Sequence, residues 1–189
     1  AKTKPFGFMP FYPGPGVGGH CIPIDPFYLT WKSREYGMPT HFIELAGQIN
    51  HSMTDYVIQR MREGLDEHVG KGLKGSRILL LGVAYKSDVD DMRESPSMFI
   101  WEKLEQFGAT VEYHDDNFSE IPPTREHGTL TGRKNVKVSK ESLAKYDAVL
   151  IATAHSNVDY EFIVNNSKLV VDTRNACKNV KDRSKVVKA

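Results

Sequence analysis

Residues 77–82 read RILLLG, and this short, almost entirely apolar segment decides the fold. Its length fits a β-strand, and the lack of a polar face predicts that both of its faces are covered. Further strand-like segments occupy residues 110–114, 136–138, 147–152 and 168–172, and helix-like segments occupy 95–107, 139–145 and 159–166. This alternation of strands and helices predicts an α/β fold with a parallel sheet between two layers of helices.

The chain ahead of the sheet predicts a loop followed by helices. Residues 5–26 contain six of the ten prolines and five glycines, so we expect an irregular loop there and a short helix over 27–36. Apolar residues then recur at three- and four-residue steps, which predicts a long amphipathic helix from Thr40, its amino cap, to about Val69. Its apolar stripe would pack within its own chain or contact another subunit.

These patterns divide the chain into two parts. Residues 1–70 would hold the loop and a helical connector, and residues 71–189 would hold the sheet. The last residues, 178–189, are basic and polar, so we expect them to fray.

Composition and charge exclude several classes of protein. The chain has 25 Lys and Arg against 24 Asp and Glu, and this balance argues against a nucleic-acid or anionic-membrane surface. No apolar run approaches the roughly 18 residues that a membrane span needs, and no secretory signal opens the sequence. Cys21 and Cys177 are too few for a disulfide framework. We expect a soluble, cytoplasmic protein that binds neither nucleic acid nor membrane.

Residues 14–21, GPGVGGHC, match the spacing of two phosphate-binding motifs. The glycines satisfy G-x-G-x-x-G, but that dinucleotide motif needs a strand before it and a helix at its end. Proline-containing segments on both sides argue against such a context. The phosphate-loop pattern also fails, because His20 and Cys21 stand where it needs Lys and Ser or Thr.

What remains in this loop is a cysteine among glycines, with Asp25 four residues later. Glycine amides can stabilise an oxyanion, and a nucleophilic thiol needs a nearby acid or base, for which His20 and Asp25 are candidates. The alternative is a buried, inert cysteine. A metal site is weaker, since no second pair of ligands has suitable spacing. A cysteine hydrolase is disfavoured, because His20 and Cys21 would point to opposite sides of an extended chain.

A second polar cluster follows the first strand, in residues 82–96. Ligands of open parallel sheets bind at the carboxyl ends of the strands, which suits Lys86 and Arg93 for phosphate. Ser95 and Pro96 fit the cap and first turn of a helix. Arg174 ends the last strand at the same edge and would join this site. A mononucleotide or nucleotide sugar fits the cluster, and a solvated charged loop is the alternative.

Together these stretches resemble one family. Residues 11–26, FYPGPGVGGHCIPIDP, resemble the catalytic-cysteine loop of the UDP-glucose/GDP-mannose dehydrogenase family, and residues 85–96 resemble its second signature. Residues 20–29 are most similar to the branch that oxidises UDP-N-acetylhexosamines. The likeness implies a Rossmann-like UDP-binding domain over 71–189. It places 1–70, with the cysteine loop and the long connecting helix, at the end of the family's central dimerisation region.

The resemblance also implies a reaction and the residues that carry it. The family oxidises the C6 alcohol of a nucleotide sugar to a carboxylate with two NAD⁺, here for surface polysaccharide biosynthesis. Cys21 would attack the C6 aldehyde to give a thiohemiacetal and then a thioester, and Asp25 would help to activate the water that cleaves it. Arg93 would face the NAD site. The residues implied in substrate binding are Tyr12, Gly14, Gly16, Gly18, Tyr85, Lys86 and Arg174.

Relative to the family, the sequence resembles a carboxyl-terminal portion. The family's NAD-binding domain would precede residue 1, so NAD would be bound mainly outside these residues. The resemblance implies a homodimer or a higher homo-oligomer. The alternative function is a non-catalytic module that binds a UDP-sugar and dimerises. The configuration of the sugar and the oligomeric state stay open.

Overall fold

The computed structural model describes residues 2–4, 6–7 and 10–189. Its helices and strands are α1 (Cys21–Arg34), α2 (His41–Val69), β1 (Arg77–Leu81), α3 (Pro96–Gln106), β2 (Thr110–His114), α4 (Lys140–Leu143), β3 (Ala148–Ile151), α5 (Tyr160–Asn166), β4 (Val170–Asp172) and β5 (Val186–Lys188). Two 3-10 turns lie at Gly128–Leu130 and Ala176–Asn179.

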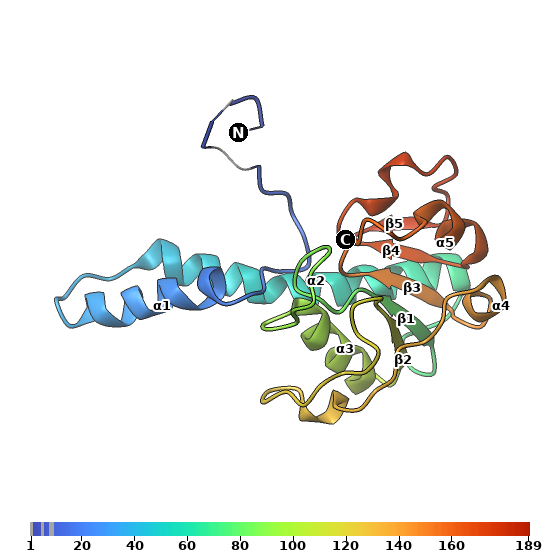
Figure 1. The fold of residues 1–189 in the computed structure, drawn as a ribbon, viewed down its shortest axis with the longest axis horizontal. Coiled ribbons are helices and arrows are strands. Elements are labelled where there is room, and N and C mark those ends of the chain that lie inside the picture. Colours follow the sequence, from blue (N-terminus) through green and yellow to red (C-terminus); the bar gives the residue numbers. More distant parts are fainter. Residues whose placement is uncertain (1, 5, 8–9) are drawn as a thin grey trace.

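A five-stranded parallel sheet lies at the centre of the larger part of the molecule, in the order β2-β1-β3-β4-β5 (Figure 1). Successive side chains of a strand point to opposite faces. Ile78 and Leu80 of β1 pack in one core with residues of α2 and α3. Leu79 and Leu81 pack in a second core with residues of α4 and α5. The apolar segment is therefore covered on both faces, which confirms the predicted α/β architecture.

The strand order creates a crevice beside β1. β2 pairs with β1 on one side, and β3 to β5 extend the sheet on the other. At such a reversal the connections leave the sheet in opposite directions, and ligands of open α/β sheets bind there, beyond the carboxyl ends of the strands. Two loops begin at this point, residues 82–95 after β1 and residues 152–159 after β3.

A helical arm projects from the sheet and is formed by α1 and the amino half of α2 (Figure 1). The Phe27 ring lies directly against Gly47, and the Thr40 hydroxyl donates to the Thr30 hydroxyl at 2.8 Å. Buried residues of α2 begin only at Thr54, where the helix passes under the sheet. The long helix is therefore confirmed, and it belongs to both parts of the chain. Neither α2 nor another helix in the described ranges is apolar enough to cross a membrane.

The start of α1 corrects the expectation of a loop up to residue 26. The helix begins at Cys21 and includes two prolines, Pro23 and Pro26. Pro23 stands in the first turn, where a backbone N–H has no partner within the helix. Pro26 leaves only the carbonyl of Ile22 without its helical partner, and Ile22 is 60% exposed, so water can replace that bond. A proline count predicts a loop here because it ignores position within the helix.

Two expectations about short segments were also wrong, one at the end of the chain and one before α4. Residues 178–189 do not fray: Val186–Lys188 forms β5, which pairs with β4, and Val187 is buried against the core. The Arg60 guanidinium donates to the Lys188 carbonyl at 3.0 Å and ties this strand to α2. Residues 136–138 form no strand, since only the bridge between Tyr113 and Asn135 continues the sheet there. Three residues are too few for sequence periodicity to distinguish a strand from a loop, which explains both errors.

Candidate functional site

The two polar motifs predicted from the sequence lie against each other. The Gly19 N–H donates to the Arg93 carbonyl at 2.9 Å, which joins the cysteine loop to the loop after β1. A Cβ on Gly18 would lie 2.6 Å from the Glu94 carbonyl oxygen and 2.7 Å from the Tyr85 Cβ. Gly19 has a positive φ of 87° and packs on the Tyr85 ring. Only glycine allows this approach, so the contact explains why the loop carries these residues.

Further contacts hold the cysteine loop to both helices behind it. The Val17 N–H donates to the side-chain oxygen of Asn50 on α2 at 2.8 Å. Gly16 has a φ of 145°, and a Cβ there would lie 3.1 Å from Pro96, the first residue of α3. Sequence reasoning missed Asn50. A lone amide within the apolar stripe of α2 was the signal that could have found it.

Cys21 is exposed at the first position of α1. The amino end of a helix carries partial positive charge from its unpaired N–H groups, which favours an anion there. Asp25 lies four residues further along the helix, so it shares the face of Cys21 and is also exposed. A cysteine and a carboxylate on one open helix face suit attack on a carbonyl followed by activation of water.

The structure changes two arguments about this loop. His20 has helical backbone angles (φ −103°, ψ −53°), so the extended-chain argument against a cysteine hydrolase was wrong. Within the described residues the His20 ring makes no hydrogen bond, and no basic side chain is hydrogen-bonded to the Cys21 thiol. The expectation that no helix follows the glycines was wrong as well. The dinucleotide motif still fails, because residues 10–13 form no strand.

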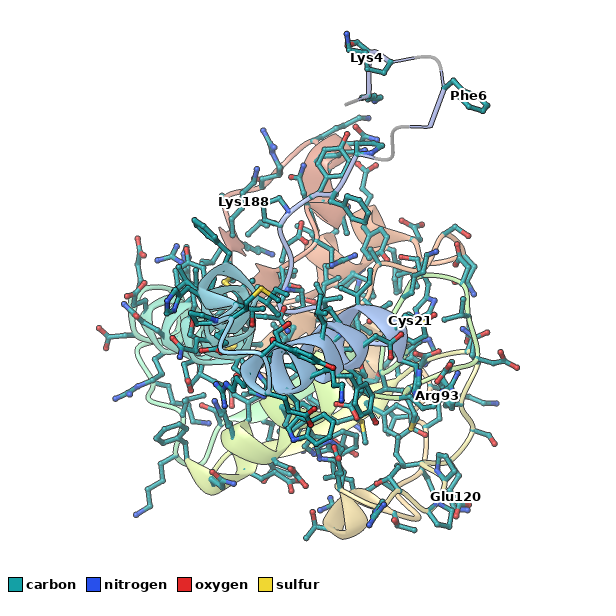
Figure 2. The ribbon with its side chains drawn as sticks, turned by 90° about the vertical axis from the view of Figure 1, so that its left-hand side faces the viewer. Lys4, Phe6, Cys21, Arg93, Glu120 and Lys188 are labelled. Carbon is teal, nitrogen blue, oxygen red and sulfur yellow. The ribbon has the colours of Figure 1, made fainter. Side chains whose placement is uncertain are left out.

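Arg93 and Asp91 form a fork-shaped ion pair in the loop after β1. The guanidinium donates to both Asp91 oxygens, and the closest contact is 2.7 Å. These hydrogen bonds and the negative charge of Asp91 raise the pKa of Arg93. Figure 2 shows Arg93 and Cys21 on the same side of the molecule. Asp91 neutralises much of the charge that Arg93 would offer to a phosphate.

Arg174 differs from Arg93 in its surroundings. It follows β4, its side chain packs directly against Gly14, and burial lowers the pKa of its guanidinium. Its backbone N–H donates to Asp172 at 3.0 Å. In the described part of the chain no carboxylate pairs with its side chain. A half-buried guanidinium without an acidic partner suits an anionic ligand.

A groove of about 750 Å³ runs between the cysteine loop, α1 and α2. Four predicted substrate residues line it: Tyr12, Gly14, Gly16 and Arg174. A second hollow of about 420 Å³ lies on the other side of the loop and includes Arg93. The remaining predicted residues border neither space: Cys21, Asp25, Gly18, Tyr85 and Lys86. The structure therefore brings the two predicted motifs together, but only some of the predicted residues line a hollow.

Lys86 stands at the crevice beside β1 and is exposed. The Tyr85 N–H donates to the Asp91 carbonyl at 2.9 Å, so the loop folds back on itself around these residues. Asp88 and Glu94 have positive φ values of 61° and 51°, which side chains rarely adopt. The described residues form no group of three or more His, Cys, Asp or Glu side chains able to hold a metal ion.

Known proteins match both parts of the chain. Residues 79–179 match the UDP-glucose/GDP-mannose dehydrogenase family, UDP binding domain, and residues 1–52 match the central domain of that family. UDP-N-acetyl-D-glucosamine 6-dehydrogenase of Pseudomonas aeruginosa is 33% identical over 159 residues, 82% of this chain and 35% of its own length. UDP-N-acetyl-D-mannosamine dehydrogenase of Methanocaldococcus jannaschii is 31% identical over 172 residues, 86% of this chain and 35% of its own.

The fold has solved counterparts as well. The UDP-D-ManNAc dehydrogenase from Pyrococcus horikoshii is similar with a TM-score of 0.75 and 27% identity, over 94% of this chain and 40% of that one. This likeness confirms the Rossmann-like sheet. The chain spans about a third of the length of the curated relatives above.

We expect Gly18→Ala to separate the two loops. The new methyl group would clash with backbone at Glu94, and overpacking of this kind costs about 1–3 kcal/mol. The amide of Gly19 should then exchange its hydrogen at least about fivefold faster, since about 1.4 kcal/mol corresponds to a factor of ten. Gly72→Ala is the control, because a Cβ there has no atom within 4 Å. Equal exchange at Gly19 in the two variants would contradict the argument.

The two cysteines should differ sharply in reactivity. Cys21 is exposed, whereas Cys177 is fully buried, and burial raises the pKa of its thiol to about 12. A disulfide reagent such as Ellman's should therefore titrate one thiol rapidly in the folded chain and a second only after unfolding. Cys21→Ser should remove the rapid phase and Cys177→Ser should leave it. A rapid phase that survives Cys21→Ser would contradict this.

Proposed function

This chain belongs to the UDP-glucose/GDP-mannose dehydrogenase family, and we propose that it is the nucleotide-sugar-binding portion of an NAD-dependent UDP-N-acetylhexosamine 6-dehydrogenase. The observation that carries the proposal is the contact between the two signature stretches, through the bond from Gly19 to Arg93 and the close approach of Gly18 to Tyr85. Two relatives named for N-acetylated UDP-sugars support the substrate class. A cytoplasmic location suits an exposed thiol that must stay reduced.

Two cations would hold the diphosphate of the substrate. Lys86 lies beyond the carboxyl end of β1 and Arg174 beyond that of β4, with no acidic partner for either in the described residues. Charge-assisted hydrogen bonds to phosphate are the strong ones, and Arg174 offers two parallel donors. The groove beside Tyr12, Gly14 and Gly16 would take the nucleoside, and the sugar would extend out of the groove to the exposed Cys21.

Cys21 would be the nucleophile and Asp25 the group that helps water. The thiolate would add to the C6 aldehyde carbon and hold it as a thiohemiacetal, so that the reactive aldehyde is not lost before the second oxidation. Asp25, on the same helix face, would accept a proton from the water that releases the acid. NAD⁺ is the oxidant that the family implies. The described residues form no strand, glycine turn and helix of the dinucleotide motif, so we assign no contact to NAD⁺ beyond the predicted role of Arg93.

The second candidate is a module that binds a UDP-sugar and dimerises without catalysis. The lack of a dinucleotide motif in the described residues favours it for this chain taken by itself. Oxidation of UDP-N-acetylglucosamine, assayed with and without a separate NAD-binding half of a relative, distinguishes the two. Turnover that depends on that half and on Cys21 supports the enzyme.

The chain should bind UDP-N-acetylglucosamine and hardly bind NAD⁺ in calorimetry. Lys86→Ala and Arg174→Ala should each weaken binding by about tenfold or more, since a hydrogen bond to a charged group contributes about 1.5–3 kcal/mol. Lys145→Ala is the control, because this exposed lysine precedes β3 and so lies at the amino ends of the strands, away from the proposed site. Micromolar affinity for NAD⁺, about −8 kcal/mol, or no binding of the UDP-sugar would refute the assignment.

We also propose that the helical arm contacts a second copy of the chain. Large apolar side chains along it are exposed, among them Phe42 at 89% and Ile49 at 54%. Both also line the groove, so a second copy would cover that wall of it. Apolar surface of this extent on a projecting arm favours association. Ile49→Asn should weaken a dimer at least about tenfold in sedimentation, with little change in monomer stability because Ile49 is half exposed in the monomer. Gln48→Asn should leave both unchanged, and a strict monomer at high concentration would contradict the proposal.

A further inference from the structure

The loop that carries Tyr85 and Lys86 is anchored at both ends by buried groups. At its start, the Val83 and Ala84 N–H groups donate to one Asp115 oxygen at 2.8 and 3.2 Å. The Ala84 carbonyl also accepts from the Thr153 hydroxyl at 2.6 Å. Asp115 follows β2 and Thr153 follows β3, and these are the two strands that flank β1. The start of the loop is therefore held from both sides.

At the other end of the loop the anchor is a histidine. The Asp88 N–H donates to His155 Nδ1 at 3.0 Å, and the Asp88 carboxylate accepts from the Ser156 N–H at 2.9 Å. These bonds hold Asp88 in its left-handed conformation, with a φ of 61°. Lys86 therefore lies in a short loop, residues 83–88, and both ends of this loop are hydrogen-bonded to residues that follow β2 or β3.

One imidazole ring connects the two anchors. His155 Nε2 lies 3.1 Å from the Asp115 oxygen that binds the loop start, and its Nδ1 accepts from the loop end. Both side chains are buried, with His155 at 5% and Asp115 at 1% exposure. Because Nδ1 accepts a hydrogen bond, the ring is neutral in this arrangement and carries its proton on Nε2. The backbone of His155 is held in turn by the Tyr160 hydroxyl, which donates to its carbonyl at 2.9 Å.

We propose that Asp115 and His155 are positioning residues of the nucleotide-sugar site, which hold residues 83–88 in the shape that presents Tyr85 and Lys86 to the ligand. The inference rests on the proposed function, since it takes these two residues as ligand contacts. Neither buried residue touches the groove or the exposed thiol. Their effect on binding would act only through the loop.

Protonation of His155 should loosen the loop. A second ring proton would sit on Nδ1 and face the hydrogen of the Asp88 amide, so that bond would be lost. The Asp88 carboxylate oxygen, 3.7 Å from Nδ1, would be drawn toward the charged ring and away from the Ser156 N–H. The charged groups around the ring are Asp115 and Asp116 after β2 and Asp88 in the loop, and the Tyr160 hydroxyl of α5 faces its backbone. The hydrogen bond to Asp115 raises the pKa of His155, against an opposing effect of burial. Affinity for the UDP-sugar should therefore fall as the ring becomes charged.

The same titration changes stability in the opposite direction. A raised pKa means that the folded state favours the charged ring, so its contribution to stability is present below the unfolded pKa. That contribution is lost as the pH rises through the raised value. A purely structural role would let binding follow stability. A positioning role separates affinity from stability. At low pH the ligand should bind more weakly, although the pair of protonated His155 and Asp115 stabilises the fold.

The test is calorimetry of the full 189-residue chain with UDP-N-acetylglucosamine between about pH 5.5 and 8, with thermal unfolding at each pH. This ligand is chosen because both phosphates of its diphosphate are esterified and do not titrate in that range. We expect binding by the unaltered chain to weaken at least about fivefold toward the acid end, with no parallel loss of stability. His155→Gln, which reaches toward Asp115 but places no acceptor at the Nδ1 position, should bind about tenfold more weakly at the upper end and lack the acid inflection.

Two variants sharpen the result. His155→Asn places an oxygen near the position of Nδ1, so it should recover part of the affinity that His155→Gln loses, without the inflection. His127→Gln is the matched control, since His127 is also buried and contacts a carboxylate, Glu102, at 2.9 Å. It should keep both affinity and inflection. If the unaltered chain binds no UDP-sugar, the proposed function and this inference fail together. If it binds and both His155 variants match it in affinity and pH profile, only the positioning role is overturned.

Discussion

The site depends on the close packing of the cysteine loop against the loop after β1. At Gly18 and Gly19 the backbone lies so near Tyr85 and Glu94 that a side chain would not fit, and one hydrogen bond to Arg93 closes the contact. Close packing of this kind has no tolerance for an added methyl group. It links a helix that begins at Cys21 to a sheet edge that the chain reaches more than fifty residues later. Every proposed role for Cys21 beside Lys86 or Arg174 requires that link.

α2 provides the support for this contact. Its carboxyl half is buried under the sheet, while Asn50 in its amino half holds the cysteine loop through Val17. Because α2 is continuous, it fixes the position of the arm relative to the sheet without an intervening loop. A rigid helix suits a site built from two parts, because catalytic geometry tolerates only small displacements.

The two arginines near the site have different electrostatic roles. Arg93 is paired with Asp91, so its net field is weak and its contribution is one of shape and of the backbone carbonyl that Gly19 binds. Arg174 is half-buried against Gly14 without an acidic partner among the described residues. Burial makes an unpaired charge costly, and a bound phosphate would relieve that cost. The sequence alone does not distinguish the two arginines, because the difference lies in their neighbours in the folded chain.

The sequence by itself determined the α/β sheet, the long helix and the two motifs. Apolar strands such as 77–82, the helical periodicity of 42–65 and the spacing of the cysteine loop are local patterns that need no knowledge of distant residues. Tertiary structure alone decided the start of α1 at Cys21, the strand at Val186–Lys188 and the contact between Asp115 and His155. Prolines are tolerated in α1 because one stands in the first turn and the other frees the carbonyl of an exposed residue, Ile22. Residues 186–188 become a strand because β4 offers an open edge. Asp115 and His155 meet because parallel strands bring their carboxyl ends together, which no local pattern records.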